Sequence, residues 1–237
     1  MSALLEVNDL RMVFGGVVAV HGLSFTVPQH SILGLIGVNG SGKSTVMHCI
    51  NGLYHPTSGS IRFRGRELTG HKPHEIAAAG IGRTFQVPRL FRRMTLVENL
   101  MVPVLNDARP TAEIIERAEH MLAGVDLFHL RHNYAEELSG GQQKLVELLR
   151  VMMFDPELIL LDEPFAGVHP SLCKVFIDQI NRLSEQGKSF ILVSHDLTSV
   201  YRLSRHILVL DQGEKIAEGG AEDIQDHPDV IEAFLGR

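Results

Sequence analysis

The stretch "SILGLIGVNGSGKSTVMHCI", residues 31–50, decides the fold of this chain. It opens with a short apolar run at 31–37 that is typical of a buried strand, and residues 45–53 have the pattern of the helix after it. Between them, "GVNGSGKST" (37–45) fits the phosphate-binding pattern GxxxxGK followed by Ser or Thr, through Gly37, Gly42, Lys43 and Ser44. This order of strand, glycine-rich loop and helix predicts a P-loop nucleotide-binding core.

The chemistry of this loop follows from its backbone. Glycines let the chain wrap so that several N–H groups point at phosphate oxygens, and the helix N-terminus adds partial positive charge. We expect Lys43 to reach the β- and γ-phosphates and the Ser44 hydroxyl to bind Mg²⁺. An ordinary glycine-rich turn is the alternative. The residues expected to contact the nucleotide here are Gly37, Asn39, Gly40, Ser41, Gly42, Lys43, Ser44 and Thr45.

The rest of the chain alternates strands with helices. Apolar runs at 158–162, 189–194 and 206–211 are typical of buried strands. Their alternation with helical patterns predicts an α/β fold with a mostly parallel sheet that is covered on both faces. Near the N-terminus, the segments 4–14 and 60–68 have the pattern of antiparallel β-structure instead.

A helical insertion interrupts this alternation. Residues 87–153 have helical stripes and no strand pattern, so we expect an inserted helical subdomain. The expected fold is therefore a single domain (1–237): a P-loop NTPase (RecA-like) core formed by 1–86 and 154–237, with an N-terminal antiparallel β part and the helical subdomain.

Composition narrows the function. A length of 237 residues suits one large α/β domain, and the net charge of −6 with a pI near 6.1 disfavours a nucleic-acid binder. The two cysteines form no CxxC pair, which favours reduced thiols in the cytosol. We find no signal-peptide pattern and no apolar run near the ~20 residues that span a bilayer, so another chain would anchor this one to a membrane.

Two adjacent acids stand at the end of a buried strand in "LLDEPFAGVHPSL" (160–172). A P-loop enzyme needs an acid at the end of a neighbouring strand to hold Mg²⁺, and Asp162 fits that place. Glu163 is then placed to polarise a water for attack on the γ-phosphate, and alternating strand directions would aim the two carboxylates differently. The alternative is that "DEP" only ends a strand. We find no guanine-reading "NKxD", so a GTPase is disfavoured.

A third motif, "ELSGGQQK" (137–144), indicates the class of ATPase. Ser139, Gly140 and Gly141 stand at a helix start, where their N–H groups and the hydroxyl can bind anionic oxygen, although a plain serine N-cap is the alternative. LSGGQ followed by an ILLDEP strand resembles the ATP-binding cassette (ABC) ATPases over nearly the whole chain. In that family LSGGQ, which here ends at Gln142, closes on the ATP held by a second subunit. The resemblance therefore implies ATP, Mg²⁺ and a homodimer or a heterodimer with a homologous ATPase subunit.

The resemblance carries over three further positions. Phe14 matches the aromatic residue that stacks on adenine, and Gln86 in "RTFQ" matches the glutamine that touches Mg²⁺ and the attacking water. His195 in "LVSHD" matches the histidine that contacts the γ-phosphate. The implied catalytic residues are Glu163, His195 and Gln86, and the implied metal-binding residues are Ser44, Gln86 and Asp162. Taken alone, Gln86 reads as a surface-loop residue, and the segment at His195 as a helix start capped by Ser194 and Asp196.

Within the family, "GIGRTFQVPRLFRRMTLVENLMV" (80–102) and the tail "HPDVIEAFLGR" (227–237) look like the ATPase subunits of branched-chain amino acid importers. "LDEPFAGV" is also similar to the lipopolysaccharide-export ATPase. The resemblance implies a peripheral protein on the inner face of the cytoplasmic membrane. It also implies that the region from Gln86 to Leu96 receives a helix of a transmembrane permease subunit.

Two alternatives and one departure stay open. A soluble ABC ATPase acting on nucleic acid or ribosomes is disfavoured by the acidic charge, and a regulator without turnover is disfavoured by Glu163 and His195. The transported solute cannot be named, because selectivity lies in other chains. His169 stands where the family commonly has Asp or Asn in a loop across the dimer interface. It is either tolerated in a polar loop or makes an interface contact that tunes closure between roughly pH 6 and 7.

Overall fold

A six-stranded sheet forms the centre of the computed structural model, which describes residues 3–235. The two residues at each end of the predicted domain, including the last two of the tail 227–237, lie outside the described residues. The strand order is β10-β9-β3-β8-β7-β6, and all neighbours are parallel except the antiparallel pair β9–β10. The strands are β3 (Ile32–Gly37), β6 (Ile81–Arg83), β7 (Leu158–Asp162), β8 (Ser189–Val193), β9 (His206–Asp211) and β10 (Glu214–Gly219).

The inner strands of this sheet are buried on both faces, which explains their continuous apolar sequences. Side chains alternate between the faces, so Leu33 and Leu35 of β3 join one hydrophobic cluster while Ile32 and Ile36 join another. The face of Ile32 and Ile36 is covered by helices from later in the chain. These helices are α5 (Gly140–Met152), α6 (Pro170–Glu185) and α7 (Leu197–Leu203).

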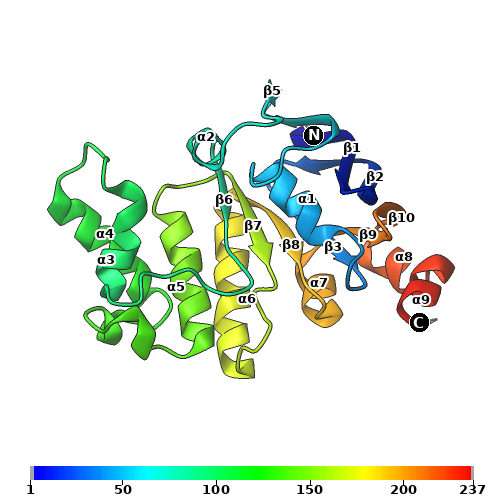
Figure 1. Cartoon of the computed structure of the whole chain (residues 1–237). Helices are drawn as coiled ribbons and strands as arrows, with labels where there is room; N and C mark the ends of the chain where they lie inside the picture. The colour runs from blue at the N-terminus through cyan, green and yellow to red at the C-terminus, as the bar shows by residue number, and fades with distance from the viewer. Residues whose placement is uncertain (1–2, 236–237) are drawn as a thin grey trace.

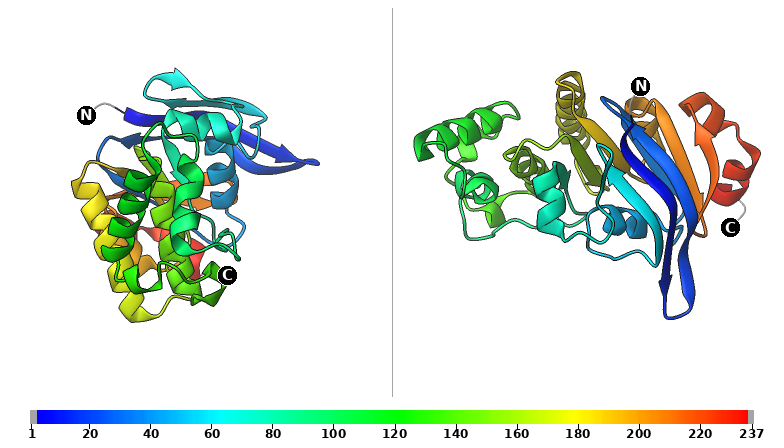
Figure 2. Two further views of the ribbon diagram at one scale, coloured as in Figure 1. Left: turned by 90° about the vertical axis from the view of Figure 1, so that its left-hand side faces the viewer. Right: turned by 90° about the horizontal axis from the view of Figure 1, so that it is seen from above.

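The other face of the sheet is covered by α1 (Lys43–Ile50) and a four-stranded antiparallel sheet (Figure 1). This small sheet has the order β2-β1-β4-β5, and its first hairpin extends well beyond the body of the molecule (Figure 2). The antiparallel β-structure predicted near the N-terminus is therefore present. The strands are β1 (Ala3–Phe14), β2 (Val17–Pro28), β4 (Ser58–Phe63) and β5 (Arg66–Glu67).

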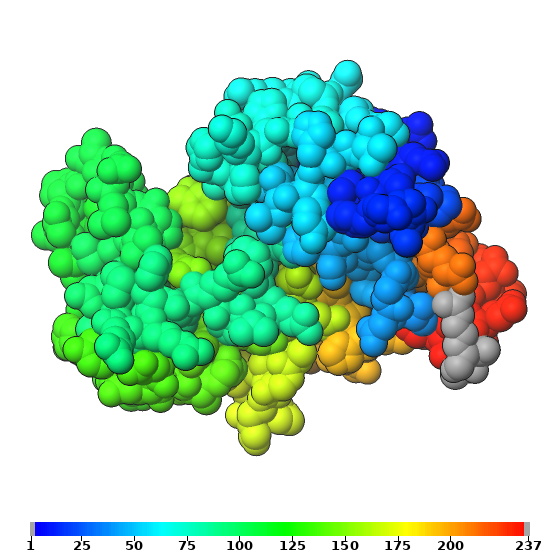
Figure 3. Space-filling model, in the orientation of Figure 1, coloured from blue at the N-terminus to red at the C-terminus, as the bar shows by residue number. Residues whose placement is uncertain are grey.

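Short helices fill the chain between β6 and β7, where the sequence predicts an insertion. In Figure 3, the green segment that contains α4 stands apart from the cyan segment at the top of the molecule. The surface between these two segments is hollowed. The insertion is not a separate core, because α4 and α5 belong to the same hydrophobic cluster as the central sheet. The boundaries 87 and 153 stay a prediction. The elements are α3 (Leu96–Met101), η1 (Val102–Val104), α4 (Thr111–Ala123), η2 (Phe128–Leu130) and η3 (Ala135–Glu137), followed by α5.

The remaining helices lie at the edges. Helix α2 (Pro73–Ala79) precedes β6, while α8 (Ala221–Gln225) and α9 (Pro228–Leu235) follow β10 at the end opposite α4 (Figure 1). The helix expected over 45–53 is shorter, since α1 ends at Ile50 and Gly52 has a left-handed φ of 73°. Within residues 3–235, every helix is too short or too polar to cross a lipid bilayer.

Candidate nucleotide-binding and catalytic site

The phosphate loop joins the carboxyl end of β3 to the start of α1. Gly42, the N-cap of α1, has a φ of 102°, and a Cβ there would lie 2.7 Å from the carbonyl oxygen of Ala19. Gly37 has a φ of 151°, and a Cβ there would overlap the carbonyl oxygen of Leu210. Only glycine fits both positions without displacing backbone. The loop therefore takes the wrapped shape that the motif predicts.

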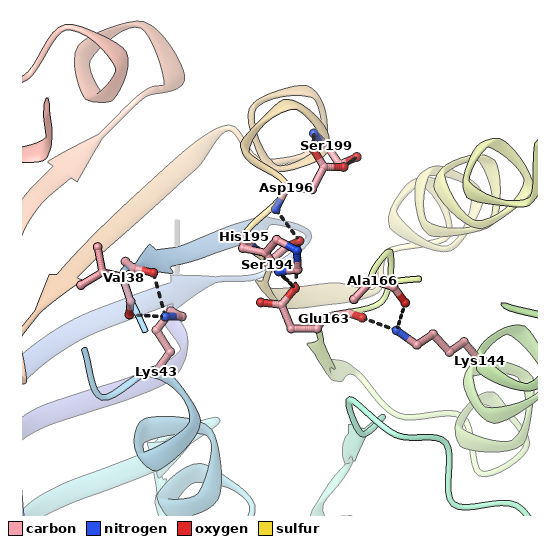
Figure 4. A network of polar contacts seen from close by, with 10 residues as sticks. Val38, Lys43, Lys144, Glu163, Ala166, Ser194, His195, Asp196 and Ser199 are labelled. Carbon is pink, nitrogen blue, oxygen red and sulfur yellow. Dashed lines mark hydrogen bonds and ion pairs between the residues drawn. The ribbon is translucent and has the colours of Figure 1, made fainter. Parts of the chain in front are cut away.

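Lys43 lies folded against this loop. Its Nζ donates to the carbonyl oxygens of Gly37 (2.8 Å) and Val38 (2.9 Å), and Figure 4 shows Lys43 beside Val38. The same Nζ lies 3.4 Å from Ser41 Oγ. Burial lowers the pKa of Lys43, while the nearby carboxylates of Glu163 and Asp162 act to raise it. The ammonium is thus held at the loop by carbonyl groups that phosphate oxygens are able to replace.

A cleft of about 230 Å³ opens beside the loop. It brings together the phosphate loop, the two adjacent acids and Gln86, which come from separate parts of the sequence. Parallel strands that end at one edge of the sheet explain this meeting. The cleft is lined by Ala19, Asn39, Gly40, Ser41, Gly42, Lys43, Ser44, Thr45, Gln86, Asp162, Glu163 and Val193.

Asp162 ends β7 and is buried, with 8% of its surface exposed. Arg83 at the end of the neighbouring strand β6 donates from Nη2 to Asp162 Oδ2 at 2.9 Å. Burial lowers the pKa of Arg83, and the hydrogen bond that Arg83 donates to Asp162 acts against this shift. The guanidinium supplies the counter-charge that a buried carboxylate needs. Sequence reasoning did not identify Arg83, although it stands in the quoted "RTFQ" segment.

Glu163 follows the strand in a left-handed conformation with a φ of 48°. The turn, and not the strand pleat, therefore sets the direction of this side chain, and the expectation from alternating strand directions is corrected. Its Oε2 accepts from Ser194 Oγ (3.3 Å) and the His195 amide (3.2 Å), and it lies 2.7 Å from His195 Nδ1 (Figure 4). The residues at the ends of β7 and β8 thus form one polar cluster.

The segment after β8 contributes Ser194 and His195 to this cluster and also begins α7. Asp196 is the N-cap of α7 and accepts from the amide of Ser199 at 3.4 Å, as the capping alternative predicted. Ser194 accepts from the Asp196 amide but directs its hydroxyl to Glu163. The imidazole of His195 is 70% exposed and does not line the cleft of the phosphate loop. Its contact within the chain is with Glu163.

The LSGGQ segment lies outside the cleft of its own chain. Ser139 is the N-cap of α5 and forms a capping box with Gln142, in which the Gln142 amide donates to Ser139 Oγ (3.4 Å) and the Ser139 amide donates to Gln142 Oε1 (3.0 Å). Ser139 and Gly140 are exposed. The structure of one chain therefore does not bring Ser139, Gly140, Gly141 or Gln142 to its own phosphate loop.

Phe14 also lies outside the cleft, near the tip of the first hairpin, and 41% of its surface is exposed. Its ring centroid is 5.2 Å from that of Tyr54 in an edge-on arrangement, and Tyr54 packs against His48 at 4.7 Å. Sequence reasoning did not identify Tyr54. It carries no motif, and only the fold places it beside Phe14.

The segment after Gln86 has both exposed and buried members. Val87 and Phe91 are 75% and 48% exposed, while Leu90 packs against the core and Leu96 is fully buried. The backbone of Phe91 is fixed by Asn99, whose Oδ1 accepts from the Phe91 amide at 2.8 Å and whose Nδ2 donates to the Phe91 carbonyl at 3.1 Å. A rigid backbone therefore presents exposed apolar side chains.

His169 is the N-cap of α6. Its Nδ1 accepts from the Ser171 amide at 3.4 Å and lies 2.8 Å from Ser171 Oγ. This local role resembles the capping by Asp or Asn at helix starts. A contact of His169 with a second subunit stays a prediction.

Comparisons with protein families point to transport ATPases. The family model described as "ABC transporter" matches residues 20–166, and the model described as "Branched-chain amino acid ATP-binding cassette transporter" matches residues 214–237. The high-affinity branched-chain amino acid transport ATP-binding protein BraF of Pseudomonas aeruginosa is 41% identical over 98% of both chains. The corresponding protein LivG of Escherichia coli is 37% identical over 98% of both chains.

Solved structures agree with this result. An ATP-binding cassette of an ABC transporter in an ADP conformation matches over 100% of both chains with a TM-score of 0.90 and 32% identity. A nucleotide-free ATP-binding cassette matches over 100% of both chains with a TM-score of 0.90 and 33% identity. The predicted fold class, an α/β P-loop core with an antiparallel β part, is confirmed by this likeness.

Proposed function

Since this chain belongs to the ABC transporter family of ATPases, we propose that it is the ATP-hydrolysing subunit that powers uptake of branched-chain or other hydrophobic amino acids. The cleft carries this proposal, because it joins a complete phosphate loop to Gln86, Asp162 and Glu163. The solute class rests on the printed names of the relatives BraF and LivG and on the family match at residues 214–237.

The donors in the cleft suit Mg²⁺. Ser44, Gln86 and Asp162 line it with hydroxyl, amide and carboxylate oxygens, and Mg²⁺ prefers oxygen ligands together with several waters. Arg83 occupies Oδ2 of Asp162, which leaves Oδ1 for the metal or its water. When bound, the ion would neutralise charge on the phosphates.

The phosphate loop is proposed to hold the β- and γ-phosphates. In this proposal, backbone amides of residues 39–45 donate to phosphate oxygens, except that of Ser41, which donates to the Val38 carbonyl at 3.2 Å. Lys43 would exchange the carbonyls of Gly37 and Val38 for phosphate oxygens. Phe14, with Tyr54 behind it, supplies a ring face for adenine.

Glu163 is proposed to act as the general base. Every hydrogen bond of its carboxylate within residues 3–235 uses Oε2, so Oε1 is left to take a proton from water. His195 Nδ1 lies 2.7 Å from this carboxylate, and we propose that the exposed imidazole contacts the γ-phosphate when ATP is bound. Gln86, which also lines the cleft, completes the set.

Two subunits are needed in this proposal. The Ser139–Gln142 segment stands at an exposed helix N-terminus and lies outside its own cleft, so it is free to contact ATP on a homologous subunit. The exposed Val87 and Phe91 then offer a permease subunit an apolar contact next to Gln86. We place the complex at the inner face of the cytoplasmic membrane, with residues 87–153 as the helical subdomain and no nucleic-acid partner.

The test is uptake in cells. A host strain that lacks this chain is complemented with the wild type or with Glu163→Gln, and uptake of labelled leucine, isoleucine and valine is measured. We expect uptake to return with the wild type alone. Unchanged uptake in the deletion strain together with a defect in lipopolysaccharide export would favour the second family member that the sequence resembles.

A further inference from the structure

Helix α5 carries two buried charges one turn apart that the proposed mechanism does not use. Lys144 and Glu147 are 8% and 1% exposed. Buried charges are costly unless hydrogen bonds satisfy them. The hydrogen bonds of both side chains go to backbone groups of loops at the cleft. We therefore expect the role of these charges to lie in fixing the conformation of those loops.

Lys144 holds the turn of the proposed base. Its Nζ donates to the carbonyl oxygens of Glu163 (2.6 Å) and Ala166 (2.8 Å), as Figure 4 shows. Glu163 has the left-handed φ of 48° that turns its carboxylate toward His195. The lysine therefore fastens both ends of the short segment on which the direction of Glu163 depends.

Glu147 holds the loop of Gln86 as an acceptor, whereas Lys144 holds its loop as a donor. Its Oε2 accepts from the Phe85 amide at 3.0 Å, and its Oε1 accepts from the Arg89 amide at 2.8 Å. The two amides bracket Gln86, and Arg150 lies 3.7 Å from Glu147 as a partial counter-charge. Both carboxylate oxygens are thus engaged with the loop that carries Gln86.

We propose that Lys144 and Glu147 are positioning residues, which fasten the loops of Glu163 and Gln86 to one helix so that both side chains move with it. The proposal rests on the function assigned above to Glu163 and Gln86. Ser139, the N-cap of α5, lies about 7.5 Å along the helix axis from Lys144. A contact made at the exposed start of α5 would therefore reach the loops of both Glu163 and Gln86 through one rigid element.

The experiment uses the full chain and steady-state ATP hydrolysis. Lys144→Met removes both bonds to the Glu163 turn, and we expect kcat to fall about 10–100-fold, since small misplacement of a reacting group has effects of this size. The affinity for a fluorescent ATP analogue stays within about twofold of the wild type, because the phosphate loop is untouched. Lys144→Arg keeps donors for both carbonyls and restores most of the rate.

A matched control is available on the same helix. Gln143 donates to the carbonyl oxygens of Ala135 and Leu138 at 3.2 and 3.0 Å, which are away from both catalytic loops. Gln143→Met loses the same kind of bond, and we expect kcat to stay within about threefold of the wild type. Equal losses of kcat in Gln143→Met and Lys144→Met would overturn the proposal.

A double variant separates positioning from general stability. If Lys144 acts through Glu163, then Lys144→Met has almost no further effect on kcat in a Glu163→Gln background. A full additional loss there overturns the proposal. Normal hydrolysis by Glu163→Gln alone would instead contradict the proposed function, so the two failures are distinguishable.

Glu147→Gln is a second and milder variant, which keeps the proposal testable if Lys144→Met fails to fold. The amide retains one acceptor oxygen and must give up the bond to one of the two amides beside Gln86. We expect kcat to fall about tenfold with unchanged nucleotide affinity. A wild-type rate in Glu147→Gln contradicts its half of the proposal.

Discussion

Lys43 and Lys144 make the same kind of contact in two different regions. Each ammonium donates to two backbone carbonyl oxygens, and burial lowers the pKa of both. The carbonyls of Lys43 lie 6 and 5 residues earlier in its own loop. The carbonyls of Lys144 lie 19 and 22 residues later, across the interface between α5 and the sheet.

The two contacts differ in the segment of backbone to which each lysine is bonded. Lys43 is at the wall of an open cleft, and its partners belong to a loop whose shape is maintained by glycines and by the start of α1. Lys144 is nearly enclosed, and its partners belong to a turn that has no regular secondary structure. In the proposed function, the first contact is exchanged for a ligand, while the second maintains the position of the proposed base Glu163.

The largest effect is expected for Glu163→Gln. The turn stays in place because Lys144 holds its backbone, but the amide cannot take a proton, so hydrolysis falls about 10²–10⁴-fold. Phosphate release gives the rate, and light scattering shows whether the variant still dimerises with ATP. Near-normal turnover would remove Glu163 from the role of base.

The second prediction tests the difference between Lys43 and Lys144 by replacing each of them with methionine. Without nucleotide, Lys43→Met is expected to melt close to the wild type. Lys144→Met leaves the buried carbonyl of Glu163 and the partly buried carbonyl of Ala166 without this donor, which costs about 1–3 kcal/mol in the free energy of unfolding. With ATP, only Lys43→Met loses the rise in melting temperature, since its affinity falls about 10–100-fold. Thermal melts with and without ATP decide the matter, and identical behaviour of the two variants contradicts the comparison.

The third prediction concerns a region that touches neither lysine. Phe91→Glu places a charge in the exposed apolar surface beside Gln86, and we expect recovery of the subunit with membranes to fall about tenfold. Cell fractionation measures this recovery. The rise in melting temperature with ATP is the control, because the nucleotide cleft is unchanged. Unaltered membrane recovery would exclude Phe91 from the permease contact.

The smallest effect is expected for the chemical reactivity of Cys49, on the helix that follows the phosphate loop. Cys49 on α1 is buried, and burial raises its pKa to about 11, so only about one thiol in a thousand is ionised at pH 8. Cys173, at the start of α6, is less buried. A water-soluble thiol reagent should label Cys173 first and Cys49 on unfolding, with peptide masses identifying each site. Equally fast labelling of both would show that α1 is less rigid than its packing indicates.

Local sequence predicted much of the cleft. The phosphate loop is contiguous, and its glycines are required by backbone contacts that the motif already implies. Asp162 was placed correctly at a strand end next to the loop, because the carboxyl ends of parallel strands meet at one edge. The direction of Glu163 was attributed to the wrong cause, since a left-handed φ in a turn gives no apolar pattern.

The sequence by itself determined the class of the fold, the phosphate loop and the two acids, because each depends on residues that are neighbours in the chain. Only the tertiary structure decided that Arg83 pairs with Asp162 and that α5 holds the loops of Glu163 and Gln86 through Lys144 and Glu147. Most of these partners are backbone carbonyl and amide groups, which every residue has. A sequence therefore carries no signature of which distant loop a buried charge will bind.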